Sequence, residues 1–123
     1  MDLAPTAAGR RIRSGIEIRA TGLVIGVLSA DGTALLRLDG DLDSASAPAL
    51  LDVGRSLVAA GSQHLVIDCG HLRFCDSAGL HAFASIGAAD GARSLALART
   101  SPRLRRMLDM AGLDVAIDPQ PTG

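Results

Sequence analysis

The chain has 123 residues and a formal net charge of -1, from 12 basic and 13 acidic residues. This length fits one domain with one core. The nearly balanced charge provides no field that would attract nucleic acid or anionic lipid. No stretch approaches the ~18 apolar residues of a membrane span, and the N-terminus lacks the apolar run of a signal peptide. We therefore expect a cytoplasmic protein that binds neither nucleic acid nor a membrane.

The two cysteines, Cys69 and Cys75, lie in apolar runs, where a thiol behaves as a small hydrophobic group. We expect both to be buried and reduced, because disulfides are rare in the cytoplasm. A zinc site takes about four ligands at paired spacings, and two cysteines with three scattered histidines do not supply them. We expect no metal and no cofactor.

The first part of the chain predicts an extension followed by a β-hairpin. Residues 1–20 mix Gly, Pro, Ala and four Arg without sustained periodicity, which indicates a mobile segment. Residues 23–28 resemble a strand, Asp31 and Gly32 form a turn dipeptide, and apolar residues then alternate over 34–38.

A helix and a buried strand are predicted next. After the turn-like residues 39–43, Ser46 is a candidate N-cap, Pro48 falls in the first turn, and apolar residues recur at helical spacing up to Gly61. Residues 65–69 form a short and nearly continuous apolar run, which is typical of a strand covered on both faces.

The last part of the chain repeats this alternation. A second helix begins at about Ser77, and residues 95–98 form the next strand. Ser101 followed by Pro is a strong helix start, and Gly112 ends that helix. The order ββαβαβα predicts an α/β fold, a small mixed sheet packed with helices through right-handed crossovers.

These elements define the expected domain limits. We expect an extension over residues 1–20, one domain over 21–118 and a disordered tail over 119–123. No surplus apolar stripe remains once the core faces are assigned, so we expect a monomer when the protein is free.

The two acidic turns at the ends of predicted strands are the candidate site, because partners of such sheets bind at the carboxyl ends of the strands. Residues 39–43 follow the second strand and residues 76–80 follow the third. Asp76 is placed to cap the second helix, with the Ser77 hydroxyl among N–H groups that lack helical partners. A phosphate there would gain from those donors and from the helix dipole. The alternatives are an ordinary polar residue at a helix start and a solvated acidic loop.

A small enzyme that uses Ser77 as nucleophile and His81 as base is a further alternative. Against it, the chain has no Gly-x-Ser-x-Gly elbow, no phosphate-binding Gly-rich loop with Lys, and no lysine at all. We therefore expect no catalysis. Four arginines, Arg99, Arg103, Arg105 and Arg106, would suit phosphate contacts, but a solvated helix face is favoured.

Three segments resemble a known family, the STAS-domain anti-sigma factor antagonists of bacteria. They are LDGDLD at 38–43, FCDSAGL at 74–80 and SPRLRRMLDMAGL at 101–113. With the element order, the resemblance covers about residues 23–117.

The resemblance implies that Ser77 is phosphorylated by a partner anti-sigma factor that is itself a serine kinase. It implies that Asp43 is the acidic turn residue beside that serine, and that Asp76 and Gly79 shape the loop. The implied partner-binding residues are Asp41, Asp43, Asp76, Ser77, Ala78, Gly79 and His81. The unphosphorylated protein would then bind the anti-sigma factor and release a sigma factor, and a serine phosphatase would reset the phosphorylated form.

The sequence departs from the family pattern at three points. Ala78 stands where many members have Ser or Thr, His81 replaces a frequent Gly, and no final helix follows the third. The alternative within the same fold is a STAS scaffold or subunit of another assembly, in lipid transport or stress signalling, without a phospho-switch.

Overall fold

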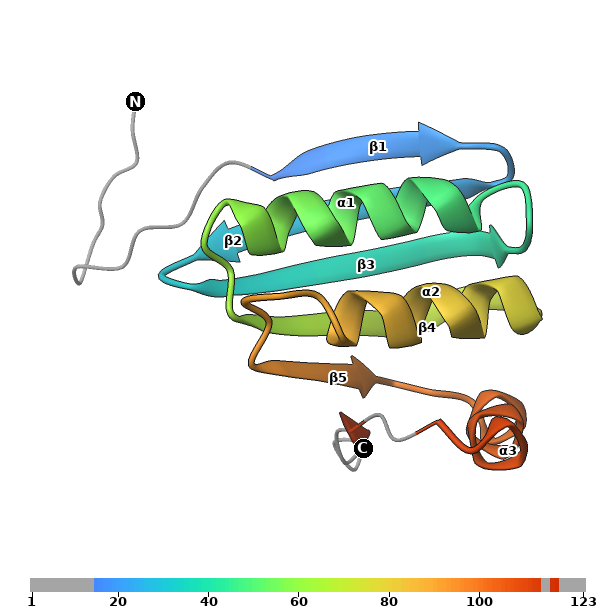
Figure 1. The fold of residues 1–123 in the computed structure, drawn as a ribbon. Helices are drawn as coiled ribbons and strands as arrows, with labels where there is room; N and C mark the ends of the chain where they lie inside the picture. Colours follow the sequence, from blue (N-terminus) through green and yellow to red (C-terminus); the bar gives the residue numbers. More distant parts are fainter. Residues whose placement is uncertain (1–14, 114–115, 118–123) are drawn as a thin grey trace.

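The computed structural model describes residues 15–113 and 116–117. These residues form one mixed sheet of six strands in sequence order, together with three helices (Figure 1). The elements are β1 (Ile16–Ala20), β2 (Leu23–Ala30), β3 (Thr33–Leu42), α1 (Ala47–Ala59), β4 (His64–Cys75), α2 (Ser77–Gly87), β5 (Ser94–Ala98), α3 (Pro102–Ala111) and β6 (Ala116–Ile117).

The direction of the strands decides where the helices lie. β1, β2 and β3 pair antiparallel, whereas β3, β4, β5 and β6 are parallel. Successive right-handed crossovers that step in one direction along a sheet leave their helices on the same face. Figure 1 shows this for α1 and α2, which lie side by side over one face, while α3 lies beyond the end of β5.

The predicted α/β order ββαβαβα is confirmed and corresponds to β2 through α3. The predicted hairpin is present, since Ala30 pairs with Thr33 across Asp31 and Gly32. These two turn residues have φ angles of 49° and 82°, as a two-residue turn with two left-handed positions requires. Ser101 and Gly112 cap α3 as expected.

The expected N-terminal extension is wrong over Ile16–Ala20, which form β1 and pair along the whole of their length with β2. Ile18 packs against the core from this strand. The two-residue β6 was not predicted either. The remainder of the expected extension, residues 1–14, and the expected tail, residues 119–123, lie outside the described residues.

Both strands that lead to the candidate site are longer than predicted. Residues 39–42, expected in a turn, continue β3, because Gly40 pairs with Leu23 on one side and Leu42 pairs with Cys75 on the other. β4 was expected to end at residue 69 and runs to Cys75. The second half of β4 is largely exposed, because β5 ends at Ala98 and does not cover it. Polar residues in this half interrupt the apolar pattern, so the sequence did not predict a strand there.

The core lies between the sheet and the two helices on its face, and it is almost entirely aliphatic. At its centre α1 approaches α2 closely at Gly54. A Cβ at this position would lie 2.6 Å from Cγ1 of Ile86, so a larger residue would push the helices apart.

On the opposite face of the sheet an ion pair joins β4 to the end of β5. Nε and Nη2 of Arg99 donate to the two carboxylate oxygens of Asp68 at 2.9 and 3.0 Å. The guanidinium lies over Gly70, where a Cβ would be 2.5 Å from Cζ of Arg99. Burial raises the pKa of Asp68, but the hydrogen bonds from Arg99 and Gly70 and the nearby arginine charges outweigh it, and the net pKa is lowered.

This lowered pKa predicts a pH-dependent contribution to stability. The ionised Asp68 stabilises the fold above the unfolded-state pKa of about 4, and the contribution is lost as the pH falls through the lower folded-state pKa. Asp68→Asn keeps an acceptor for the Gly70 N–H. We expect it to reduce the free energy of unfolding by up to about 1 kcal/mol at pH 7, since partly exposed ion pairs contribute little.

Urea unfolding at pH 7 and pH 3 measures the effect, and the difference between Asp68→Asn and wild type should shrink at pH 3. Asp90→Asn, at an exposed turn, serves as the matched control and should have no such effect. A difference that stays constant between the two pH values would contradict the ion-pair interpretation.

Candidate functional site

The carboxyl ends of β3 and β4 lie level with each other and form one edge of the sheet. Leu42 and Cys75 are register partners, and the N–H of Asp76 donates to the carbonyl oxygen of Leu42 at 3.2 Å. Asp43 and Asp76 are therefore the next residues on adjacent strands. The two predicted acidic segments meet at this edge.

Asp76 caps α2, as predicted. Its Oδ1 atom accepts hydrogen bonds from the N–H groups of Ala78, at 2.9 Å, and Gly79, at 3.3 Å. Ser77 is the first residue of α2 and is exposed. The expectation that a phosphate on Ser77 would find these N–H groups without partners is wrong, because Asp76 already accepts from two of them.

Gly79 is needed where α2 starts over the strand ends. A Cβ at this position would lie 2.7 Å from Sγ of Cys75 and 2.8 Å from Cγ of Leu42. Neither contact is tolerable, so the first turn of α2 reaches the sheet only with glycine here. Gly79 thus lies in the helix and sets the distance of Ser77 from the sheet.

Asp43 is a turn residue as well as an acidic one. Its Oδ1 accepts from the N–H groups of Ala45 and Ser46 at 3.0 and 3.2 Å, which holds the chain as it enters α1. Ser46 is the N-cap residue, as predicted, but its side chain forms no capping hydrogen bond. Its buried hydroxyl instead donates to the carbonyl oxygen of Asp41 at 2.8 Å and accepts from the Asp43 N–H at 3.0 Å.

The remaining predicted residues surround this edge. Asp41 is half-exposed at the end of β3, and its Oδ1 lies 3.7 Å from Nε of Arg73. Ala78 is half-buried and packs against the core. His81 is exposed one turn after Ser77, and within residues 15–113 the two side chains do not hydrogen-bond to each other.

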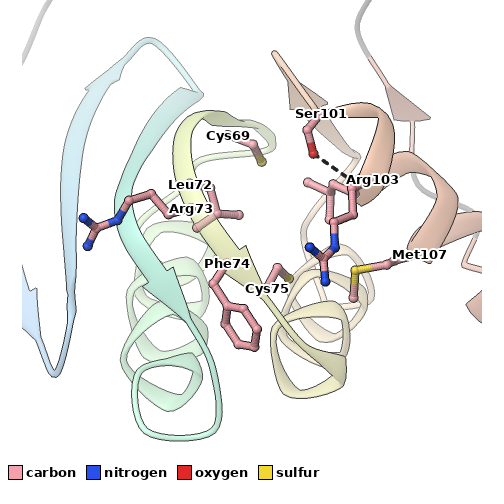
Figure 2. Close-up of a pocket in the computed structure, with 9 residues that line it drawn as sticks. Cys69, Leu72, Arg73, Phe74, Cys75, Ser101, Arg103 and Met107 are labelled. Carbon is pink, nitrogen blue, oxygen red and sulfur yellow. Dashed lines mark hydrogen bonds between the residues drawn. The ribbon is translucent and has the colours of Figure 1, made fainter.

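The sequence analysis missed a small hollow between the second half of β4 and α3, shown in Figure 2. Its volume is about 50 Å³. It is lined by Cys69, Leu72, Arg73, Phe74, Cys75, Ser101, Arg103, Leu104 and Met107. Four of the nine, Leu72, Arg73, Phe74 and Cys75, come from the part of β4 that was not predicted as a strand. In the sequence, the aromatic residue Phe74 of the FCDSAGL segment was the one indication of a surface here.

Two classes of feature are missing from the described residues. No group of three or more His, Cys, Asp or Glu side chains within residues 15–113 and 116–117 is arranged to hold a metal ion. Over the same residues, none of the helices has both the length and the apolarity to cross a membrane.

Both thiols are free. Cys69 is buried as expected, whereas Cys75 is only half-buried, because it lies at the edge of the hollow. Burial raises the pKa of each thiol to about 12, and the nearby Asp76 carboxylate adds to the effect at Cys75.

These raised pKa values predict slow modification of both cysteines. A pKa of about 12 in place of 9.0 reduces the thiolate fraction at pH 8 by roughly three orders of magnitude. We expect labelling of the native protein by a disulfide reagent to be at least ~100-fold slower than labelling in urea. Rapid labelling without unfolding, followed by mass spectrometry of the modified peptide, would show which thiol is reactive and contradict the assignment.

Solved structures with this fold include three anti-sigma factor antagonists. An anti-sigma factor antagonist from Mycobacterium paratuberculosis is 27% identical, with a TM-score of 0.69 over 79% of this chain and 86% of that one. SpoIIAA in its unphosphorylated form is 17% identical, with a TM-score of 0.57 over 86% of this chain and 88% of that one. The phosphorylated form of SpoIIAA from Bacillus is 18% identical, with a TM-score of 0.55 over 89% and 92%.

The SpoIIAA structures show the shared fold alone at this identity, whereas the mycobacterial protein is also related in sequence. A search of the curated proteins finds no match to the chain. The family model described as "Mlab, STAS domain" matches residues 25–118, which span β2 to β6 and contain the whole candidate site. The chain therefore belongs to the STAS-domain family.

Proposed function

We propose that this protein is an anti-sigma factor antagonist whose binding is switched off by phosphorylation of Ser77. In its unphosphorylated form it binds an anti-sigma factor that is a serine kinase, and so releases a sigma factor. A serine phosphatase restores the binding form. The observation that supports this most directly is the exposed Ser77 at the start of α2, on the edge that also carries Asp43 and Asp76.

The geometry of α2 favours a switch that leaves the fold intact. Ser77 is exposed, and within the described residues its side chain forms no hydrogen bond that a phosphate would break. A phosphate adds a charge of roughly -1.5 to -2 at neutral pH. Near the positive end of the helix dipole, and hydrated, this charge costs the free protein little.

The same charge is costly once a partner covers it. The phosphate must then lose water close to the carboxylate of Asp76, whose position is held by its two hydrogen bonds to the helix. An uncompensated buried charge costs about 3 to 5 kcal/mol. At 1.4 kcal/mol per tenfold change in affinity, the loss is roughly a hundredfold to a few thousandfold.

Replacement of Ser77 tests this switch. Ser77→Ala should bind the kinase partner and stay bound in the presence of ATP, and Ser77→Asp should bind weakly, with wild-type circular dichroism in both. The partner is identified by incubating the protein with ATP and each anti-sigma kinase of the same genome, followed by intact mass measurement. Equal affinity of phosphorylated and unphosphorylated protein for the partner that phosphorylates it would overturn the proposal.

Asp43 has a turn role and an expected partner-binding role, and two variants separate them. Asp43→Asn keeps the Oδ1 acceptor for Ala45 and Ser46 and removes the charge, whereas Asp43→Ala removes both. We expect Asp43→Asn to fold with wild-type stability but to be phosphorylated at least about tenfold more slowly. Asp43→Ala should in addition lose about 1 kcal/mol of stability, as the loss of a side-chain acceptor for backbone N–H groups at a helix start does.

The kinase assay with Asp43→Asn and thermal unfolding of both variants check this. Phosphorylation of Asp43→Asn at the wild-type rate would leave Asp43 with the turn role alone.

A STAS scaffold without a phospho-switch is the second candidate. Two observations favour it: the family model bears the name Mlab, and Ala78 packs against the core where many anti-sigma factor antagonists have a hydroxyl residue. This candidate predicts a stable complex with a protein that lacks kinase activity, and no phosphate on Ser77 with any anti-sigma kinase of the genome.

A further inference from the structure

The second half of β4 is open along the side where β5 has ended. β5 stops at Ala98, which pairs with Asp68, and in the described part of the chain no strand pairs with Cys69–Cys75 on that side. Instead α3 lies beside this stretch with the hollow between them (Figure 2). α3 contributes only two buried residues, Leu104 and Leu108.

Apolar and cationic side chains both line the hollow. Figure 2 shows Arg103 and Met107 extending from α3 toward Cys75. Arg103 is exposed, and it forms no ion pair within the part of the chain that the structure describes. Beside the hollow, Phe74 leaves 45% of its surface exposed, one of few large apolar residues to do so. An exposed aromatic side chain at the border of such a hollow is typical of a binding surface.

The hollow adjoins the Ser77 edge. Cys75 lines it and also limits the approach of Gly79 in the first turn of α2. Phe74 is the register partner of Asp41. The charges of this continuous surface are divided: Asp41, Asp43 and Asp76 lie at the strand ends, and Arg103, Arg105 and Arg106 lie on α3.

We propose that this hollow, with Phe74 and Arg103, is a docking site for a segment of the protein partner that carries an apolar side chain next to a carboxylate. The apolar side chain packs on Leu72 and Met107 in the hollow, whose volume of about 50 Å³ suits one small aliphatic group, and Phe74 contacts the segment at the end of β4. The carboxylate pairs with Arg103. The charge of α3 selects an acidic segment, and a basic segment is repelled.

This site rests on the proposed function, since its occupant is the anti-sigma kinase that modifies Ser77. It adds a second contact region, outside the acidic edge, that fixes which kinase binds. Affinity should therefore depend on the hollow even when Ser77 is unmodified.

The experiment measures binding of the unphosphorylated protein to the kinase identified by the Ser77 phosphorylation assay. Phe74→Ala should weaken binding about 10- to 100-fold, as loss of an aromatic anchor does. Arg103→Glu should weaken it at least about tenfold, with a smaller effect at high salt. Circular dichroism and thermal unfolding verify that each variant is folded, and Arg103→Glu, at an exposed position, supports the test if Phe74→Ala is unstable.

Two variants are matched controls. Leu28→Ala removes a side chain of similar exposure, 42%, far from the hollow in β2, and Arg55→Glu reverses an exposed charge on α1, outside the lining. Both should bind within about twofold of wild type.

The outcomes separate the two proposals. Wild-type affinity of both Phe74→Ala and Arg103→Glu, with binding still abolished by phosphorylation of Ser77, would overturn the docking site and leave the switch. A loss of equal size in Arg55→Glu would also overturn it, because it would show a general charge effect. If no kinase of the genome binds or phosphorylates the wild-type protein, the proposed function fails and the assignment of the occupant fails with it.

Discussion

The register between β3 and β4 is the constraint on which the candidate site depends. Both strands start level, with Thr33 opposite His64, yet β4 uses 12 residues to reach the end of the ten-residue β3. Two register shifts absorb the difference. With an unshifted register Leu42 would lie opposite Arg73, and Asp76 would lie well beyond the sheet edge. The two register shifts place Cys75 opposite Leu42, so Asp43 and Asp76, which follow the two strands, are neighbours at the sheet edge.

The close packing at the start of α2 depends on this register. Cys75 and Leu42 together form the surface onto which Gly79 packs, and that contact sets the height of the first helical turn above the sheet. Asp76 then fixes its direction through two backbone hydrogen bonds. Ser77 is thus held by backbone geometry on both sides and needs no side-chain partner, which keeps its hydroxyl exposed.

The sequence allowed the fold class and the caps of α2 and α3 to be predicted, because these follow from local patterns. Asp76, Ser101 and Gly112 are recognisable from their neighbours alone. The bulged half of β4 was not predictable, because its exposed residues follow neither a twofold nor a helical period. β1 was missed for a different reason: its residues IEIRA do alternate apolar and charged side chains, but a run of five is too short to stand out from the Gly- and Arg-containing segment before it.

The roles of single residues were harder to predict than the helices and strands, because one side chain can have two roles. Asp43 resembled a binding residue, and the structure adds a turn role that composition does not reveal, because the acceptor bonds go to the backbone of residues 45 and 46. Ser46 looked like a side-chain cap and is instead a buried link between Asp41 and Asp43. In both cases the missing information was the direction of a side chain, which residue type does not specify.

The division of charge along the edge bears on how a single phosphate can act as a switch. The acidic residues at the strand ends and the arginines of α3 make the surface dipolar while the whole chain stays near neutral. A phosphate on Ser77 adds to the acidic side only, so it changes the surface near Asp76 far more than it changes the net charge of the protein. Because Asp76 already accepts from the N–H groups of Ala78 and Gly79, those donors are not free to neutralise the added charge. The phosphate must therefore be neutralised by water or by a partner, and water is what a partner displaces when it covers the edge.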